Sequence, residues 1–328
     1  MKTKTKIHFV CHANRYRSRL AEAYAKSLGR DDIEFSSSGA AAISTATMPG
    51  YAIESAERNG VASYLGTQCR RLSPEMINDN DIIIFMRRSI FDEAQAKHGF
   101  DDKKCLVWDV KDNVDWPSAK AFKRQQQKTY KLIERNINKL LKDIDTGGWV
   151  DIVDQYNRPL NLKLPLNMVN QKGLWHRGCH AVISLPNNKV LVQKRSANII
   201  FSPKLIDITM GGHVDAGEQP KTALLREIKE EIGITADTKT IRLLNVHKAP
   251  SYHPRYKRHS NAFVYTYHVP LNQEKPQMSL EKSEVSAMKA ISPRQLKRLL
   301  KTKRLKRLGR LNYTHAYYQQ MVADAGLL

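Results

Sequence analysis

The residues best suited to chemistry in the first part of the chain lie in the segment CHANRYRS. Cys11 closes an apolar run, and Arg17 and Ser18 come just before a helical pattern begins. The start of a helix offers backbone N–H groups to an anion, and a guanidinium group matches phosphate oxygens. The same groups favour the reactive thiolate, and Ser18 can donate a hydrogen bond to the sulfur. We therefore expect a cysteine nucleophile in a phosphate-binding loop made of Cys11, His12, Ala13, Asn14, Arg15, Tyr16, Arg17 and Ser18.

This loop fits the pattern C-x5-R-S, and the chain around it resembles the low-molecular-weight protein tyrosine phosphatases over about residues 5–145. The segments SSSGA and DIIIFM, which follow it, are part of the same resemblance. The resemblance implies a flavodoxin-like α/β fold, no cofactor, and a phosphocysteine intermediate that forms on Cys11 with the help of Arg17 and Ser18.

The same resemblance implies a general acid late in the domain, within the stretch WDVKDNVDW. It places Asp112 in that role, with Asp109 and Asp115 as alternatives. Three positions depart from the family pattern: Ala13 in place of glycine, Tyr16 in place of a second cysteine, and Asn113 in place of proline. No tyrosine pair follows the acid, which favours a phosphomonoester substrate over phosphotyrosine in particular. Arsenate reduction, a second activity of this fold, needs downstream cysteines that FMRRSIFDEA lacks.

The second candidate site is a group of carboxylates in the segment GHVDAGEQPKTALLREIKEEIGI. Glu227, Glu230 and Glu231 stand at i, i+3 and i+4, so they project from one face of a helix. Like charges at this spacing repel one another, and a cation that takes them as ligands reverses the sign of that interaction. Hard carboxylate oxygens suit Mg²⁺ or Mn²⁺. We therefore expect a metal-dependent site on this helix.

The spacing of this segment matches the Nudix box, G-x5-E-x7-R-E-U-x-E-E-x-G-U, at each defined position. The resemblance implies that water cleaves a diphosphate linkage with the help of the metal. It assigns Glu227 and Glu231 as metal ligands and Glu230 as a ligand or as the catalytic base. It also implies that Glu218 and Arg226 form an ion pair that holds the loop against the helix. The backbone carbonyl of Gly212 is the candidate for a further metal ligand.

Within the Nudix proteins, the segment resembles the branch that includes isopentenyl-diphosphate isomerase. That isomerase has a catalytic cysteine just before a histidine, whereas glycine precedes His213 here and Cys179 lies on another strand. The missing thiol favours hydrolysis over isomerisation. His180, His213 and His253 are candidate substrate contacts, although each is more typical of a histidine with a satisfied hydrogen bond. The basic loop 253–260 is either a phosphate- or base-binding loop or a solvated turn.

The elements that must position these residues follow an α/β pattern. In the first domain, predicted at 1–146, apolar strands alternate with helical segments, which predicts a parallel sheet with helices on both faces. In the second domain, predicted at 147–328, strands surround the carboxylate-bearing helix in an α/β/α sandwich with a mixed sheet. The segment 145–151, with two glycines, is the predicted linker. The strands are predicted at 7–11, 33–39, 81–86, 105–110, 180–195 (a hairpin), 240–248 and 261–269, and a closing helix at 292–311.

The composition is that of a globular, basic protein, with 54 Lys and Arg against 32 Asp and Glu and a net charge of +22. That charge favours phosphorylated or other polyanionic partners. The basic C-terminal segment 294–310 is suited to nucleic acid or an anionic membrane surface, but packing of its leucines as an amphipathic helix is the favoured interpretation. Four cysteines without paired spacing predict neither disulfides nor a zinc site. No segment is long enough for a signal peptide or a membrane span, and we expect a cytoplasmic protein.

Together, the two sites predict a bifunctional phosphate-removing enzyme that acts on phosphorylated small molecules or phosphoproteins. One domain would hydrolyse a phosphomonoester and the other a nucleoside diphosphate or a related X–P–P–Y compound. The alternative is a regulatory or nucleic-acid-binding phosphate sensor in which one domain is inactive.

Overall fold

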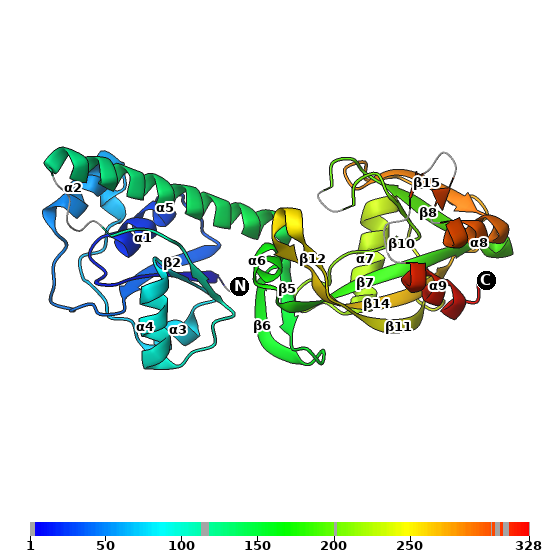
Figure 1. Ribbon diagram of the computed structural model, residues 1–328, viewed down its shortest axis with the longest axis horizontal. Helices are drawn as coiled ribbons and strands as arrows, with labels where there is room; N and C mark the ends of the chain where they lie inside the picture. Colours follow the sequence, from blue (N-terminus) through cyan, green and yellow to red (C-terminus); the bar gives the residue numbers. More distant parts are fainter. Residues whose placement is uncertain are drawn as a thin grey trace. The chain divides into compact units, whose positions relative to one another are not determined.

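The computed structural model describes residues 4–112, 118–199, 202–302, 304–305, 309–310 and 315–327. The chain divides into two compact units, Met1–Gly147 and Gly148–Leu328 (Figure 1). Each unit has its own sheet and its own helices. The candidate cysteine site lies in the first unit and the candidate carboxylate site in the second.

The first unit contains a four-stranded parallel sheet in the order β2–β1–β3–β4. Its strands are β1 (Thr5–Cys11), β2 (Ile33–Gly39), β3 (Ile82–Phe85) and β4 (Cys105–Val107). All four residues of β3 are fully buried, as expected for a strand covered on both faces. The parallel sheet that the sequence predicts is confirmed. Its last strand ends at Val107, earlier than the predicted residue 110.

Helices cover both faces of this sheet, with α1 and α5 on one side and α3 and α4 on the other (Figure 1). The helices are α1 (Arg17–Ser27), α2 (Gly50–Arg58), α3 (Pro74–Asp79), α4 (Arg88–His98) and α5 (Ala119–Gly147), with a short 3-10 turn η1 (Ala62–Tyr64). The long helix α5 buries one stripe, in which Ile133, Ile137 and Ile144 recur at helical spacing. It extends to Gly147, and Gly148 with its φ of 65° is followed directly by a strand at Trp149. The division between the two units falls within the predicted linker 145–151, but regular structure reaches both sides of Gly148.

The second unit is built on a nine-stranded mixed sheet with β7 at its centre. β7 pairs in parallel with β14 and antiparallel with β5, β8 and β10. The strands of this sheet are β5 (Trp149–Val153), β6 (Pro159–Pro165), β7 (Trp175–Leu185), β8 (Lys189–Arg195), β9 (Ile206–Asp207), β10 (Thr209–Met210), β11 (Arg242–Ala249), β14 (Asn261–Pro270) and β15 (Val285–Ile291). The remaining elements are α6 (Leu166–Lys172), η2 (Pro186–Asn188), β12 (Tyr252–His253), η3 (Pro254–Tyr256), β13 (Arg258–His259), β16 (Arg304–Leu305) and β17 (Gly309–Arg310).

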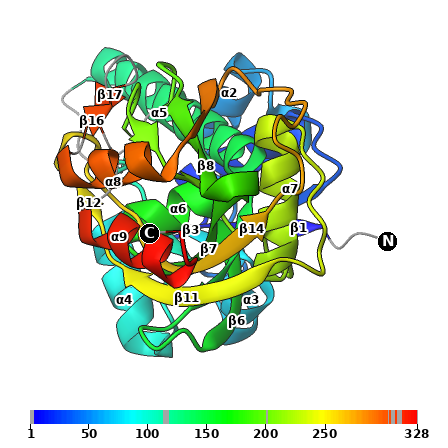
Figure 2. The same cartoon turned by 90° about the vertical axis from the view of Figure 1, so that its right-hand side faces the viewer.

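Alternate residues of β7 face two different hydrophobic cores. Ala181 and Ile183 pack with α7 (Pro220–Ile232), whereas Val182 packs with α8 (Pro293–Thr302) and α9 (His315–Asp324). Figure 2 shows α7 on one side of β7 and the pair α8 and α9 on the other. The predicted α/β/α sandwich with a mixed sheet is confirmed.

The C-terminal segment differs from the prediction. The sequence predicts one helix over residues 292–311, but α8 ends at Thr302 and a short pair of strands, β16 and β17, follows. The leucines of α8 are buried, as the amphipathic pattern predicts. Beyond Thr302 the basic, leucine-rich pattern continues in the sequence, so the spacing alone does not mark the end of the helix. Helix α9, which has no strong apolar stripe, is absent from the prediction.

None of the helices in the described ranges has the length and apolar character that a membrane crossing demands. All four cysteines are buried free thiols.

Candidate active sites

The cysteine site forms where β1 ends and α1 begins. Cys11 is the last residue of β1 and is 2% exposed. Asn14 adopts a left-handed conformation with φ of 54°, which turns the loop back so that its N–H donates to the Cys11 sulfur at 3.2 Å. The Ser18 hydroxyl donates to the same sulfur at 3.0 Å. No side chain caps α1, so the amides of its first turn remain available to an anion.

Arg17, the first residue of α1, is fixed by two partners from the segment after β4. Its side chain is 3% exposed, one guanidinium nitrogen donates to the Val110 carbonyl at 3.1 Å, and another is ion-paired with Asp112. A buried guanidinium held in one orientation presents its planar donors at a fixed position. Of the predicted acids, Asp112 thus lies at the loop, Asp109 is exposed on the segment after β4, and Asp115 falls outside the described residues.

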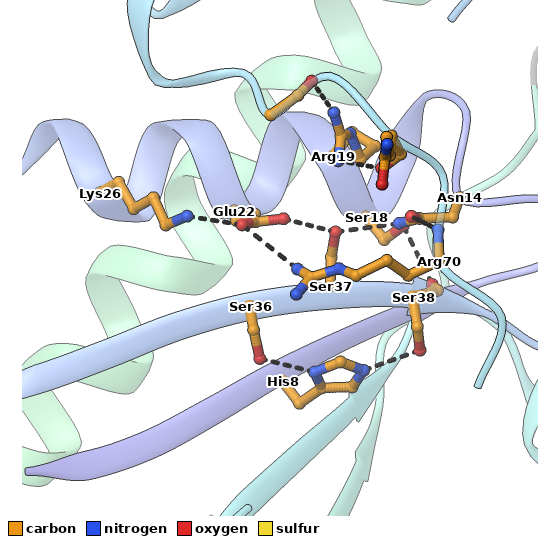
Figure 3. Close-up of polar contacts among 12 residues, drawn as sticks. His8, Asn14, Ser18, Arg19, Glu22, Lys26, Ser36, Ser37, Ser38 and Arg70 are labelled. Atoms are coloured by element: carbon orange, nitrogen blue, oxygen red, sulfur yellow. Dashed lines mark hydrogen bonds and ion pairs between the residues drawn. The ribbon is translucent and has the colours of Figure 1, made fainter. Parts of the chain in front are cut away.

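A second layer of polar side chains holds the loop from behind (Figure 3). The Asn14 side-chain amide donates to Ser18 at 3.0 Å and to Ser37 at 2.9 Å, and Ser37 in turn donates to Glu22 at 2.6 Å. The amide of Arg70 donates to the Asn14 side-chain oxygen at 2.8 Å. Sequence reasoning did not single out Ser37, Glu22 or Arg70. A signal was present in α1, where polar residues at i and i+4 line one stripe of an otherwise buried helix.

The other loop residues lie at the rim. His12 is exposed and faces Glu93 at 3.6 Å, and Arg15 donates to the Thr47 carbonyl at 2.8 Å. Tyr16 is buried, and its ring meets the Tyr51 ring edge-on at 5.5 Å. Burial, followed by the charge of Asp112, raises the pKa of Tyr51. Ala13 lies against β2, since a Cβ at Gly39 would come within 2.8 Å of the Ala13 carbonyl carbon.

The carboxylate site is carried by α7, which starts at Pro220 and ends before Gly233, whose φ is 72°. Glu231 is 7% exposed, and one of its oxygens has no hydrogen-bond partner. Burial, then the charges of Glu227 and Glu284, raise the pKa of Glu231 well above its ordinary value. Burial raises the pKa of Glu227 to about 7, although Arg226 opposes the shift. The two carboxylates are therefore short of compensating positive charge.

Arg226 is the cation that contacts this cluster. It lies 3.1 Å from Glu218, 3.0 Å from Glu227 and 3.2 Å from Glu230. The pair predicted between Glu218 and Arg226 is present as a two-point contact. Glu230 is 61% exposed, so it differs from its buried neighbour Glu231 in its access to solvent.

Gly212 packs directly against Glu227. A Cβ at this position would lie 2.4 Å from a Glu227 carboxylate oxygen, so any other residue here would displace the Glu227 side chain. The Gly212 carbonyl accepts the Cys179 amide at 2.9 Å. The Cys179 thiol also donates to this carbonyl at 3.7 Å, so the oxygen predicted as a metal ligand already accepts two hydrogen bonds.

The residues on α7 fit a divalent cation in their chemistry. As they stand, no three His, Cys, Asp or Glu side chains within the described ranges converge on a point that could hold a metal ion. The fit rests on the unpartnered oxygen of buried Glu231 and on the raised pKa of Glu227, because a dication would supply the charge that both carboxylates lack. Glu284, whose charge acts on both, was missed by sequence reasoning, since nothing in its own segment marks it.

The remaining candidates lie away from solvent or on the surface. Burial raises the pKa of Cys179 to about 12, so this thiol is poorly suited to proton transfer. Burial lowers the pKa of both His180 and His213 to about 4. His180 is hydrogen-bonded to the Tyr317 hydroxyl at 2.6 Å and His213 to His176 at 3.0 Å. The His253 ring lies 4.7 Å from the Tyr256 ring, with the two planes inclined by 37°.

Comparison with known families agrees with this division into two sites. Residues 6–148 match the model of the low molecular weight phosphotyrosine protein phosphatases, and residues 174–311 match the NUDIX domain. The chain joins a phosphatase-family domain to a NUDIX domain. Both are hydrolase families, and both resemblances predicted from the sequence are confirmed.

The curated relatives match the NUDIX part. An uncharacterized Nudix hydrolase of Yersinia pestis is 38% identical over 86 residues, which are 26% of this chain and 47% of that protein. One of Nostoc sp. is 29% identical over 125 residues, 38% of this chain and 70% of that protein. The chain spans about half the length of the first of these relatives.

Solved structures resemble parts of the chain. A low molecular weight protein tyrosine phosphatase of Bacillus subtilis covers 42% of this chain and 99% of its own, with 22% identity and a TM-score of 0.37. DR0079 of Deinococcus radiodurans covers 52% of this chain and 96% of its own, with 17% identity and a TM-score of 0.39.

Proposed function

We propose that this protein is a bifunctional phosphate hydrolase with two independent active sites. The N-terminal unit would hydrolyse phosphomonoesters, and the NUDIX unit would hydrolyse the diphosphate linkage of a nucleoside diphosphate or a related X–P–P–Y compound. The observation that carries the first half is the Cys11 sulfur, which accepts two hydrogen bonds inside a loop that also holds the buried Arg17. An anionic sulfur and a phosphate dianion both gain from this surrounding.

In the phosphatase unit, the Cys11 thiolate would attack the phosphorus atom of the bound ester. The phosphorus–oxygen bond to the leaving group breaks while Asp112 gives its proton to that oxygen. Arg17 and the first amides of α1 would hold the three non-bridging oxygens. Water then attacks the phosphocysteine, its proton returns to Asp112, and inorganic phosphate leaves with the thiolate restored.

In the NUDIX unit, Glu227 and Glu231 would hold Mg²⁺ or Mn²⁺. When bound, such an ion would offset the charge of the diphosphate oxygens and lower the pKa of the attacking water. Arg226 and Glu218 would keep the loop before α7 in place through their two-point contact. Glu230, solvent-accessible on the same helix, is the candidate to accept the proton of the attacking water.

The two reactions are chemically consecutive. Cleavage of X–P–P–Y leaves phosphomonoesters, which are the substrate class of the cysteine site. Tethering two sites on one chain raises the effective concentration of a shared intermediate to the millimolar range, on the order of that found for short linkers. Phosphoproteins are the alternative substrates of the first unit.

Two variants test the proposal. Cys11→Ser should abolish hydrolysis of an aryl phosphate in the presence of chelator and leave Mg²⁺-dependent cleavage of ADP-ribose or another dinucleoside or nucleoside diphosphate substrate intact. Glu231→Gln should do the reverse. If either variant abolishes both activities while its circular dichroism spectrum is unchanged, the sites are not independent and the proposal is wrong.

A further inference from the structure

A short hairpin on the NUDIX unit exposes two tyrosine rings. Residues 251–260, here called the tyrosine hairpin, consist of β12, η3 and β13. Tyr252 is 53% exposed and Tyr256 is 39% exposed. Part of each ring is accessible to solvent, although Tyr256 also contacts His253 and Arg255 within the hairpin. The hairpin has no role in either hydrolytic site described above.

The stretch of chain that contains these rings is basic and has no acidic residue. The sequence contains no Asp or Glu from residue 238 to residue 273. Arg255, Lys257 and Lys248, which precedes the hairpin on β11, are exposed, and in the part of the chain that the structure describes none of them is ion-paired with a carboxylate. Elsewhere in the protein, exposed cations such as Arg158 and Lys139 do pair with acids.

The cations and the aromatic rings are also in contact. The Arg255 guanidinium lies over the Tyr256 ring, 5.6 Å from its centre, and the Lys248 ammonium lies 4.9 Å from the centre of Trp175. The Tyr256 and Trp175 rings thus each have a positive charge beside them, whereas the Tyr252 ring has His259 as its neighbour. This combination offers a flat face for a base and a cation for the phosphate next to it.

The hairpin is held in place by its base. The Ser260 amide donates to the Ser251 carbonyl at 2.8 Å, and the Tyr252 ring lies 4.8 Å from the His259 ring, with the two planes inclined by 45°. Arg258 donates to Asn167 of α6 at 2.6 Å, which fastens the hairpin to the rest of the unit. The rings are thus preorganised, so binding would order few additional side chains.

We propose that the tyrosine hairpin binds single-stranded nucleic acid, with unpaired bases stacked on Tyr252 and Tyr256 and backbone phosphates paired with Lys248, Arg255 and Lys257. Charge complementarity supports this partner, since the whole protein carries +22. A membrane surface is disfavoured because SYHPRYKRHS contains no Leu, Ile, Phe or Trp to insert among lipid chains. A duplex is disfavoured because its bases are not available for stacking on a protein ring.

Fluorescence anisotropy of the full-length protein with a fluorescein-labelled U12 RNA tests the proposal, and dT12 DNA tests whether the 2′-hydroxyl matters. Tyr252→Ala with Tyr256→Ala should weaken binding by about tenfold or more, since base stacking on each ring is lost. The dependence of the affinity on salt concentration should stay unchanged. Tyr252→Phe with Tyr256→Phe should restore it. Arg255→Ala with Lys257→Ala should instead reduce the slope of log K against log salt by about 1.4, the value for two phosphate contacts on a single strand.

A matched control removes the same charge from α8, where Lys297 and Lys301 are also exposed. The variant Lys297→Ala with Lys301→Ala should bind as the wild type does. If it loses as much affinity as the hairpin variants, the binding is a property of net charge and the proposal is overturned. It is equally overturned if the tyrosine variants bind normally, if no RNA or DNA binds at 50 mM salt, or if vesicles of phosphatidylserine and phosphatidylcholine bind the hairpin while the oligonucleotides do not.

Discussion

The Glu22 carboxylate and the Cys11 thiol are connected by an unbroken series of hydrogen bonds, although neither touches the other. The series passes through Ser37, the Asn14 side chain and Ser18, with heavy-atom distances between 2.6 and 3.0 Å. Glu22 is itself buried and lies against Lys26 and Arg70. A buried carboxylate with this many hydrogen bonds and ion pairs fixes the orientation of the donors around it. The orientation of the groups that bind the sulfur is therefore determined by residues that lie behind the loop.

Breaking this series at Ser37 should impair the phosphatase site. In Ser37→Ala, buried Glu22 loses a donor and the Asn14 amide loses an acceptor, which should cost about 1–3 kcal/mol of unfolding free energy. We expect a lower kcat on an aryl phosphate, with the NUDIX activity unchanged. Ser36→Ala is the matched control, because Ser36 bonds His8 and not the series. Equal kcat values for the two variants would contradict the coupling.

Asp112 should act as the acid that protonates the leaving group. The variant Asp112→Asn should reduce kcat by about 10²–10⁴-fold on an alkyl phosphate, where protonation is needed, and much less on p-nitrophenyl phosphate. If the only role of Asp112 were to hold Arg17, both substrates would lose rate equally. Asp109→Asn provides the control, since this exposed residue should change neither rate.

Gly39 should tolerate no side chain. A Cβ at this position would lie 2.6 Å from the backbone nitrogen of Asn14 and from the carbonyl oxygen of His12, and neither backbone atom can move without distorting the loop. Gly39→Ala should therefore abolish phosphatase activity and lower the thermal stability of the first unit. Gly50→Ala, where a Cβ meets nothing within 4 Å, should leave both unchanged. An active Gly39→Ala enzyme would show that the loop is not held in this conformation.

The sequence predicted those parts of the sites in which the spacing of residues determines the geometry. Glu227 and Glu231 lie on one helix, so their mutual position follows from the helical repeat, and the loop from Cys11 to Ser18 is contiguous. Glu284 could not be found this way, because its distance from α7 depends on how separate segments pack. The same holds for Arg70, which reaches Asn14 across 56 residues of chain.

The differences between prediction and structure have one physical origin. The local sequence pattern of a segment does not show which other segments pack against it. Residues 292–311 keep a basic, leucine-rich pattern throughout, yet the helix ends at Thr302. The predicted linker 145–151 does contain the division between the units, but its two glycines differ in role. Only Gly148 adopts a special conformation between α5 and β5, while Gly147 completes the helix.

His8 should make the first unit sensitive to acid. Its ring bonds Ser36 at 2.6 Å and Ser38 at 2.7 Å, and burial, followed by the charge of Arg70, lowers its pKa from 6.5 to about 3. Below pH 6.5 the unfolded chain binds a proton at His8 that the folded chain does not bind. The free energy of unfolding is therefore highest above pH 6.5 and decreases as the pH falls toward 3. From pH 8 to pH 5 the loss should be roughly 2 kcal/mol.

Hydrogen exchange of the β1 peptide in the full-length protein measures this effect. Protection of residues 5–11 should fall between pH 8 and pH 5, after correction for the intrinsic exchange rate. In His8→Asn, which keeps a polar group between the two serines but does not titrate, that fall should shrink even if the overall stability is lower. A variant with the same pH dependence as the wild type would assign the acid sensitivity to other groups.

Glu231 should destabilise the metal-free NUDIX unit and bind the metal that relieves this. Its pKa is raised by burial and by Glu227, so stability is highest while the carboxyl is protonated and falls as rising pH ionises it. At pH 8, with chelator, Glu231→Gln should therefore melt at a higher temperature than the wild type. Addition of Mg²⁺ should raise the melting temperature of the wild type and not that of the variant, because only the charged pair gains from a dication.

Glu230→Gln, changed at an exposed position, should retain the Mg²⁺ response. If Glu231→Gln melts lower than the wild type in chelator and still responds to Mg²⁺, the buried carboxylate is a structural group and the metal binds elsewhere.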